Sequence, residues 1–289
     1  MRIPNSLLTL IDYGVIDEVL RPLMSGKEAQ VYLVRLGDEL RVAKVYKTST
    51  NRSFKKRSIY TEGRKTRNSR DRRAVSRRSR HGKAIDEEAW RSTEVNMINR
   101  LQRAGVRVPK PYCFESGILV MEMITDTDHS PAPRLGEVKL DIEVARKIYD
   151  HLIQEIIRML CAGIVHGDLS EFNILLGSDG PVIIDFPQSV DTAHNNNARE
   201  LLLRDVQNIH DFMLSYDPQF IACPYGEEMW DLYCSNELTS ETSLTGHWEP
   251  SKKAANLTQV YDLIHDANEE ALVRRERNIH PRRRRRKRR

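Results

Sequence analysis

The stretch HGDLSEFNILL, residues 166–176, combines three polar side chains with the start of an apolar run. Asp168 and Asn173 are five residues apart, and Asn173 comes directly before the apolar residues ILL. The turn GSDG and a second apolar run, PVII, follow, and Asp185 comes just after that run. Two short buried strands around such a turn form a hairpin, so we expect Asn173 and Asp185 to lie close together.

These side chains form an oxygen-rich set of the kind that binds a metal ion together with phosphate. Mg²⁺ prefers oxygen ligands and usually takes one or two from the protein and others from phosphates. Asn173 and Asp185 supply such ligands, which leaves Asp168 to face an acceptor hydroxyl group. The spacing matches the H-x-D-x-x-x-x-N catalytic loop of protein kinases, which a metal-binding aspartate follows. A polar loop that arose by chance is the alternative, but the aspartate of IIDF, twelve residues after Asn173, favours the functional interpretation.

A lysine in the first half of the chain is the expected partner for the phosphates. The run VAKVYK places Lys44 between apolar neighbours of a predicted strand, and a buried ammonium group is costly unless an anion neutralises it. Glu94 is the expected anion, because apolar residues three and seven positions later lie on its side of a predicted helix. The pair would direct the ammonium group toward the α- and β-phosphates. A solvated position for Glu94 is the alternative, since Glu87 and Glu88 lie one or two turns earlier.

A turn before the first predicted hairpin is a second candidate for phosphate binding. In the sequence MSGKEAQVY, Ser25 offers a hydroxyl group, Gly26 a backbone amide that phosphate can approach closely, and Lys27 an ammonium group. Gly26 is the sole glycine of this turn, and neither G-x-G-x-x-G nor G-x-x-x-x-G-K-[ST] occurs there. Taken alone, the pattern is a weak signal.

The length of the chain and the positions of its cysteines limit the class of protein to which it can belong. The 289 residues suffice for one large domain or two lobes with a sizeable core. No apolar run is long enough to span a bilayer, and the N-terminus lacks the features of a signal peptide. The four cysteines are scattered without a C-x-x-C pair, which favours single thiols in a reducing compartment over a zinc site or disulfides. We therefore expect a cytoplasmic protein with no membrane partner.

Charge is distributed very unevenly along the chain. The net charge of +5 is the balance of +12 in residues 49–84, +8 in residues 282–289 and −15 in the remainder. A block of like charges repels itself and resists folding into a core. The two basic segments are therefore predicted to be mobile when free and to bind polyanions, above all RNA or a ribosomal particle.

The order of predicted elements indicates an α+β fold with two lobes and a crevice between them. Strands and one helix come first, and the rest is mostly helical with one small hairpin. The predicted divisions are an N-terminal helix and lead-in (1–22), an N-lobe (23–125) with a flexible basic loop (49–84), a C-lobe (126–277) and a disordered basic tail (278–289). The predicted helices are residues 5–13, capped by Asn5 or Ser6, and residues 85–104, 140–161, 198–216, 227–236 and 258–275.

Four stretches, SGKEAQVY, VAKVYKTS, HGDLSEFNILL and IIDFPQSV, together resemble the RIO family of atypical serine/threonine protein kinases. The similarity is to the Rio1-type branch, in a bacterial form, and runs from about residue 8 to residue 216. It implies a trimmed two-lobe kinase fold without the activation segment that ends in A-P-E. The chain departs from ordinary kinases after the metal-binding aspartate. They continue with F-G, whereas this chain continues with FPQ, so Pro187 stands where they have a flexible glycine.

The resemblance also implies roles for individual residues. Lys44 would bind ATP, Asp168 would be the catalytic acid/base, and Asn173 and Asp185 would hold Mg²⁺, with Mn²⁺ as an alternative. Asp185 would also become transiently phosphorylated. The backbone of Glu122 and Ile124, in the hinge sequence MEMI, would bind adenine.

Four functional hypotheses follow. The first is an ATP- and Mg²⁺-dependent serine/threonine protein kinase of unidentified protein substrate that phosphorylates itself on basic-loop serines. The second is an ATPase switch that acts on ribosomal RNA, because relatives of the family act in small-subunit maturation. The third is a small-molecule kinase of the aminoglycoside type, which HGDL and NILL allow and SGKEAQVY disfavours. The fourth is a nucleotide-binding scaffold without turnover.

Asp205 either braces the catalytic loop or is an ordinary helix carboxylate. The candidate autophosphorylation sites are Ser53, Ser58, Ser69, Ser76 and Ser79.

Overall fold

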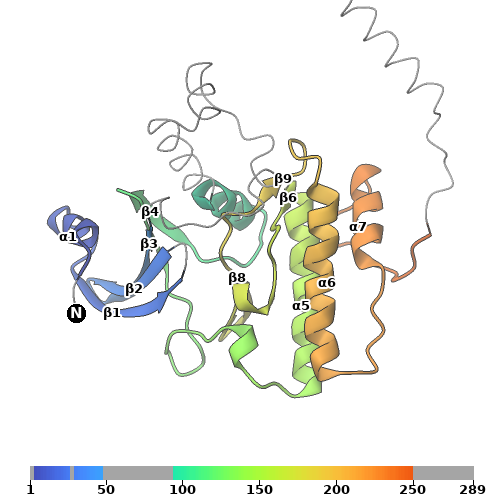
Figure 1. Ribbon diagram of the computed structural model, residues 1–289, viewed down its shortest axis with the longest axis horizontal. Coiled ribbons are helices and arrows are strands. Elements are labelled where there is room, and N and C mark those ends of the chain that lie inside the picture. Colours follow the sequence, from blue (N-terminus) through green and yellow to red (C-terminus); the bar gives the residue numbers. More distant parts are fainter. Residues whose placement is uncertain (1–2, 27–28, 48–93, 250–289) are drawn as a thin grey trace, which may run out of the picture. The chain divides into compact units, whose positions relative to one another are not determined.

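The computed structural model describes residues 3–26, 29–47 and 94–249 (Figure 1). Residues up to His247 form one compact unit, and the elements below all belong to it. We call its described residues up to 122 the N-lobe and residues 135–247 the C-lobe. The predicted basic loop, the basic tail, the predicted helix at residues 258–275 and residues 85–93 of another predicted helix lie outside the described residues.

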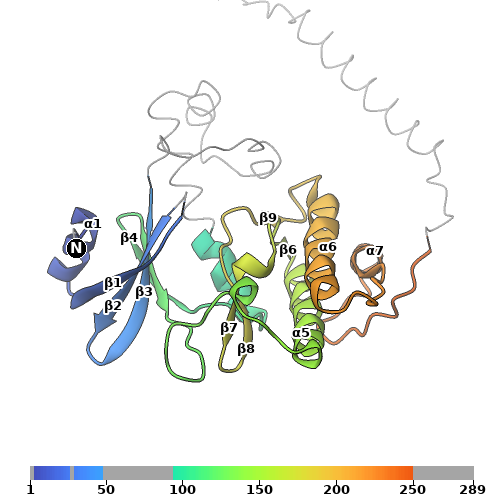
Figure 2. The same ribbon diagram turned by 60° about the horizontal axis from the view of Figure 1, so that its bottom comes forward.

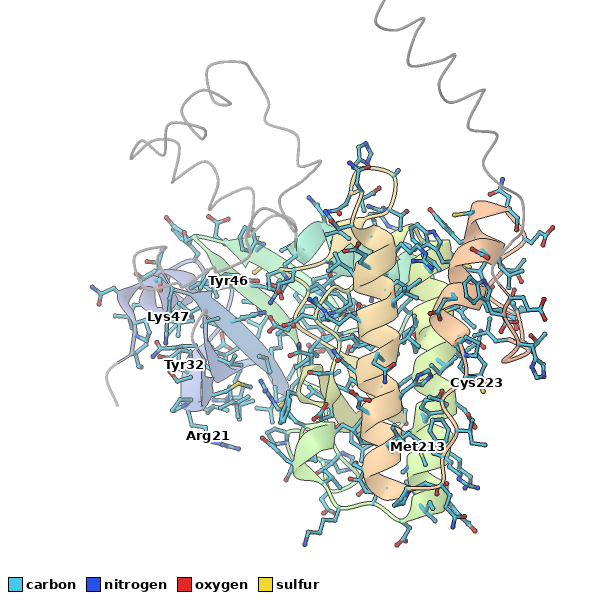
Figure 3. All side chains as sticks on the ribbon, turned by 45° about the vertical axis from the view of Figure 1, so that its right-hand side comes forward. Arg21, Tyr32, Tyr46, Lys47, Met213 and Cys223 are labelled. Atoms are coloured by element: carbon cyan, nitrogen blue, oxygen red, sulfur yellow. The ribbon has the colours of Figure 1, made fainter. Side chains whose placement is uncertain are left out.

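The N-lobe is built on a five-stranded antiparallel sheet with the strand order β1-β2-β3-β5-β4. Successive side chains of a strand point to opposite faces, so Ala43 and Lys44 of the central strand face opposite ways. Ala43 lies in an apolar cluster with Tyr32 of the neighbouring strand (Figure 3). The strands are β1 (Glu18–Ser25), β2 (Ala29–Leu36), β3 (Glu39–Tyr46), β4 (Pro111–Glu115) and β5 (Ile118–Glu122).

Helix α1 (Asn5–Asp12) covers the Ala43 face of the sheet, where Leu7 and Leu10 are fully buried. The prediction that Asn5 or Ser6 caps this helix was wrong. Pro4 occupies the cap position without a side-chain hydrogen bond, and its carbonyl accepts the first helical bond from the Leu7 N–H at 3.0 Å. The Leu7 N–H is one of the donors that a polar cap side chain would otherwise accept, so the Pro4 carbonyl takes the place of such a cap.

The described part of the next helix, residues 94–103, lies between the sheet and the C-lobe. Its Met97, Ile98 and Leu101 are buried in a large apolar cluster that also contains Tyr46 of β3 and Met213 of the C-lobe (Figure 3). A single core therefore runs from the inner face of the sheet into the C-lobe. Gly105, with a positive φ of 78°, ends the helix as its sequence predicts.

Helices dominate the C-lobe, and α5 and α6 lie side by side (Figure 2). Helix α6 has the predicted bounds, whereas α7 begins and ends two residues before the prediction. At its C-terminal end, Asn236 adopts a left-handed φ of 64° outside the helix. None of the described helices is both long and apolar enough to cross a membrane. The helices are α5 (Ile142–Cys161), α6 (Ala198–Tyr216) and α7 (Tyr225–Cys234), with 3-10 turns η2 (Leu135–Glu137) and η3 (Glu171–Asn173).

Two small two-stranded antiparallel sheets lie against these helices. Strands β7 (Ile174–Gly177) and β8 (Gly180–Ile183) pair as the sequence predicts. Strands β6 (Ile164–Val165) and β9 (Val190–Asp191) pair as well, but the sequence did not predict them. Strands of two residues are too short to show a hydrophobic period.

Helix α1 offers a matched pair of substitutions that tests its packing on the sheet. Leu10 is fully buried, whereas 43% of Leu8 is exposed. Replacing Leu10 with alanine leaves a cavity, so we expect the free energy of unfolding to fall by about 2–5 kcal/mol. Leu8→Ala should change it by no more than about 0.5 kcal/mol. Urea titration of both variants measures this, and equal losses would show that the helix does not pack as described.

Candidate active site

A buried lysine joins three separate parts of the chain at the centre of the candidate site. Lys44 Nζ lies 2.6 Å from Glu94 Oε1 and 2.7 Å from Asp185 Oδ1. Lys44 comes from β3, Glu94 from the helix that includes residues 94–103, and Asp185 from the loop after β8. The Tyr46 hydroxyl donates a hydrogen bond to the second oxygen of Glu94. Glu94 is only 1% exposed, so the alternative of a solvated Glu94 is excluded.

Opposite charges keep this cluster ionised despite its burial. Burial by itself would lower the pKa of Lys44, but the carboxylates of Asp185 and Glu94 outweigh it and hold that pKa above its ordinary value. Burial opposes ionisation of Asp185 as well, yet Lys44 lowers the pKa of Asp185 below its usual range. The Asp185 side chain is 43% exposed, so one side of the cluster opens toward solvent, where a ligand can reach it.

The β7–β8 hairpin places Asn173 and Asp185 at its open end. Ile174 pairs with Ile183, and beyond that pair the Ile184 N–H donates to the Asn173 carbonyl at 3.0 Å. Asp185 follows directly with a φ of 73°, a left-handed conformation that aspartate tolerates better than most residues. The hairpin therefore brings the two residues together, as the spacing predicted.

Asp168, the aspartate of the predicted catalytic loop (residues 166–173), has an exposed side chain. Its backbone carbonyl accepts a hydrogen bond from Asn173 Nδ2 at 2.8 Å, and its Oδ2 accepts one from Gln188 Nε2 at 2.9 Å. The surrounding protein raises the pKa of the Asp168 carboxyl and nearby Asp185 adds to this, whereas Arg204 and Gln188 oppose it. Gln188 was not among the residues singled out from the sequence.

Side chains of helix α6 form hydrogen bonds with the backbone of the catalytic loop. Asp205 accepts hydrogen bonds from the N–H groups of Gly167 at 2.7 Å and Leu169 at 2.9 Å. Asn208 Nδ2 donates to the Leu169 carbonyl at 2.7 Å, and Arg204 donates to the Gly167 carbonyl. Burial raises the pKa of Asp205 to about 7, although the two N–H donors act against the shift. Asp205 thus braces the loop, which decides between its two proposed roles.

Arg204 and Asn208 were missed in the sequence. The signal that existed was their place beside Asp205. Arg204 directly precedes it and Asn208 follows it by three residues, on a helix whose Leu202, Val206 and Ile209 are buried. A polar group on a buried helix face needs a hydrogen-bond partner. Periodicity alone does not identify that partner.

His166 is a buried, neutral element of the same loop. Its Nε2 lies 3.1 Å from the Ile184 carbonyl, its Nδ1 lies 3.3 Å from the Asp168 N–H, and its ring packs on Phe186 with centroids 5.0 Å apart. A proton on Nε2 satisfies both contacts, since the carbonyl needs a donor and the N–H needs an acceptor. Burial lowers the pKa of His166 to about 4. The residue ties the loop to the strand end that precedes Asp185.

The predicted phosphate turn lies at the end of β1, where Ser25 and Gly26 are described and Lys27 is not. The Gly26 N–H donates to the Ala29 carbonyl at 2.9 Å, and Lys47 Nζ donates to the Gly26 carbonyl at 2.6 Å. Lys47 is thus a further cation at this turn, labelled in Figure 3. Just before the turn, Arg134, which directly precedes η2, contacts Met24, with 2.8 Å between its guanidinium nitrogen and the sulfur.

The predicted adenine contacts lie at the end of β5 and in the connection to the C-lobe. The Glu122 N–H donates to the Lys110 carbonyl at 2.8 Å, and the Ile124 carbonyl accepts from the Ala132 N–H at 2.9 Å. A carbonyl oxygen has two lone pairs, so Ile124 retains one acceptor position. The Glu122 side chain points to structural partners, because its carboxylate accepts from the Lys110 N–H and from Arg107.

The residues at the open end of the hairpin fit a small divalent cation that shares its coordination with phosphate. Asn173 uses its amide nitrogen in the loop, which leaves its side-chain oxygen as a ligand, and Asp185 offers a carboxylate. No group of three or more His, Cys, Asp or Glu residues that could hold a metal occurs in the described residues. Two oxygen ligands are what a metal-nucleotide site requires, since phosphates and water complete the shell.

Comparisons with known proteins give one consistent family. The family model described as RIO domain matches residues 30–221. The RIO-type serine/threonine-protein kinase Rio1 of Haloferax volcanii is 36% identical over 208 residues, which cover 72% of this chain and 67% of the relative. The human serine/threonine-protein kinase RIO1 is 34% identical over 242 residues, covering 81% of this chain but only 39% of the relative.

Solved structures match more weakly. A crystal structure of a kinase domain, PF14_0431, covers 68% of this chain and is itself covered over 63%, at 15% identity and a TM-score of 0.43. The kinase PK-1 of Cydia pomonella granulovirus gives 18% identity and a TM-score of 0.39, with 65% of this chain and 58% of that chain covered. The family assignment therefore depends on the sequence matches.

The lowered pKa of His166, about 4, makes the stability of the protein depend on pH. The unfolded chain binds the proton more readily, so the contribution of neutral His166 is complete above about pH 6.5 and is lost as the pH falls toward 4. Between pH 7 and pH 5, the wild type should lose about 2 kcal/mol more unfolding free energy than a His166→Asn variant.

Urea titration at the two pH values measures both losses. Asp205 and His210 titrate in both proteins, so the difference between the proteins reports His166 alone. Identical pH dependence in wild type and variant would contradict a neutral, buried His166.

Proposed function

The chain belongs to the RIO family, and from this premise we propose that it is an ATP-dependent kinase that phosphorylates serine and threonine side chains of proteins. Its matched region spans 67% of the Haloferax relative and 39% of the human one. The activity of the whole relatives is therefore carried over as a proposal. Family membership also favours a protein kinase over a small-molecule kinase.

The observation that carries the proposal is the assembled contact of Lys44 with Glu94 and Asp185. Phosphoryl transfer requires positioning and charge stabilisation more than covalent chemistry. In protein kinases the lysine–glutamate ion pair and the metal-binding aspartate must both be in place for activity. Here both lie within 2.7 Å of one lysine nitrogen, which supports a chain with turnover over a scaffold without it.

We assign the roles as follows. Lys44 binds the phosphates of ATP, and Ser25 and Gly26, at the end of β1, bind them together with Lys27, which lies outside the described residues. Asn173 and Asp185 hold the divalent cation, which neutralises charge on the phosphates when it is bound. Glu94 orients the ammonium group of Lys44, and the backbone of Glu122 and Ile124 binds adenine. The family implies a divalent metal, and the oxygen ligands favour Mg²⁺, with Mn²⁺ as an alternative.

Asp168 faces the acceptor. The acceptor oxygen forms a bond to the γ-phosphorus while the bond from that phosphorus to the leaving oxygen of ADP breaks, and Asp168 takes the proton of the acceptor hydroxyl. Asp185 has a second proposed role as a transient phosphoryl acceptor. The candidate autophosphorylation serines of the basic loop lie outside the described residues. All four cysteines are free thiols, which supports the cytoplasm as the proposed location.

Transfer of labelled phosphate from ATP tests this function. With Mg²⁺ present, we expect label on the protein itself or on a basic carrier protein, and Asp168→Ala should reduce the rate by about 10²- to 10⁴-fold. Asp179→Ala, an exposed aspartate in the β7–β8 turn, is the matched control and should keep the wild-type rate.

Absence of transfer from the wild type, with Asp168→Ala indistinguishable from it, would refute the kinase. Calorimetric titration with ATP, with and without Mg²⁺, tests the site separately. Lys44→Ala should weaken nucleotide binding, because it removes the ammonium group that faces the phosphates.

A second function, binding of RNA or a ribosomal particle, is proposed on the basis of charge. The basic segments carry +12 and +8 against −15 in the remainder. Positive charge of this size attracts polyanions to the two basic segments, and this attraction does not depend on the nucleotide sequence. The two functions are compatible, since an ATPase switch on an RNA particle would use the same nucleotide site.

The dependence of RNA affinity on salt tests the second function. Each phosphate that the protein neutralises should add about 0.7–0.9 to the slope of log affinity against log salt concentration. A chain without residues 282–289 should therefore show a smaller slope than the full chain, measured by fluorescence anisotropy with single-stranded and duplex RNA. RNA binding that is absent, or that does not respond to salt, would rule this function out.

A further inference from the structure

Gln188, to which the sequence patterns assigned no role, contacts Asp168, the proposed catalytic aspartate. Its Nε2 donates a hydrogen bond to Asp168 Oδ2 at 2.9 Å. The two residues are twenty positions apart and come from opposite sides of the β7–β8 hairpin. A carboxylate that is exposed to solvent rotates about its terminal torsion, which has a broad energy minimum. A donor on one of its oxygens restricts that rotation.

A hydrogen-bonded turn that contains a proline carries Gln188. The Ser189 N–H donates to the Phe186 carbonyl at 3.1 Å, which closes a β-turn with Pro187 and Gln188 in the middle. Proline is favoured at the first of these positions because its φ is already fixed. Ordinary kinases have the glycine of D-F-G at the Pro187 position, which leaves φ free where proline fixes it.

Both ends of the turn are fastened to the base of the catalytic loop. Phe186 is fully buried and packs on the ring of His166. Ser189 Oγ donates to the His166 carbonyl at 3.2 Å, and Val190 pairs with Val165 of β6. His166, two residues before Asp168, and Ser189, directly after Gln188, therefore belong to one hydrogen-bonded unit, which limits the distance between the two side chains.

We propose that Gln188 is a positioning residue for phosphoryl transfer, because its amide holds one oxygen of Asp168 so that the other faces the acceptor hydroxyl. This inference rests on the proposed kinase function. It explains how a chain without an activation segment keeps its catalytic carboxylate oriented: a short proline turn does so from a fixed position. Gln188 itself touches neither the nucleotide nor the transferred proton in this arrangement.

Substitution of Gln188 in the full chain separates positioning from a structural role. Gln188→Met keeps the length of the side chain and removes the donor, so kcat should fall by about 10- to 100-fold through misorientation of Asp168. Gln188→Glu should reduce kcat further, since a carboxylate then faces Asp168. The affinity for ATP, measured by calorimetry with Mg²⁺, should stay within about twofold of wild type. Gln219→Met, an exposed glutamine after α6, is the control and should leave all values unchanged.

A double-mutant cycle provides the decisive readout. In an Asp168→Asn background, which removes the carboxylate that Gln188 positions, the Gln188→Met substitution should have no further effect on the residual rate. Transfer to the carrier protein and hydrolysis of ATP should fall in parallel in the single variant, because both require Asp168. A loss of hydrolysis alone would instead place Gln188 beside an attacking water and overturn the proposal.

The failure of this inference is distinguishable from failure of the kinase itself. If the wild type transfers phosphate but Gln188→Met keeps its kcat, or lowers the rate equally with and without the Asp168 carboxylate, the positioning role is refuted and the kinase stands. A lower melting temperature with unchanged kcat would likewise assign Gln188 to folding only. If the wild type transfers no phosphate, both proposals fall.

Discussion

A single buried ammonium group constrains the arrangement of this protein. Lys44 must be neutralised where it lies, and the two carboxylates that neutralise it come from the helix that includes residues 94–103 and from the loop after β8. Removing one partner of a buried charge pair strongly destabilises a protein, because it leaves an uncompensated charge. The sheet, this helix and the β7–β8 hairpin are therefore linked by electrostatics as well as by the apolar core, and they meet where the phosphates are proposed to bind.

A second set of contacts fixes the catalytic loop without using any residue of the sheet. Helix α6 accepts two loop N–H groups through Asp205 and donates to loop carbonyls through Asn208 and Arg204. The proline turn fastens the loop from the opposite side through His166. The loop thus has little freedom, which suits a reaction that depends on positioning. An active site of this kind needs no long segment to order it.

Local patterns in the sequence predicted much of the fold. Alternating apolar residues marked β2 and β3, and the 3.6-residue period marked α5 and α6, because burial of one face is a local requirement that each segment shows by itself. The polar cap proposed for α1 was wrong because proline met the same need through its carbonyl. The two-residue strands β6 and β9 escaped notice, since they exist only through pairing with each other.

The sequence by itself determined which groups are proposed to carry the chemistry: a lysine in an apolar strand, an aspartate and an asparagine before a short strand, and an aspartate after its partner. Their types and spacing suffice because each is unusual in its local context. The helical period also singled out Glu94 as the partner of Lys44, and the tertiary structure confirmed that pair. Tertiary structure alone decided that Arg204 and Asn208 bind the loop beside Asp205, and that Gln188 contacts Asp168. Lys44 is 50 residues from Glu94 and 141 from Asp185. Contacts between residues so far apart in the sequence depend on how the helices and strands pack against each other. No local hydrophobic period encodes that packing.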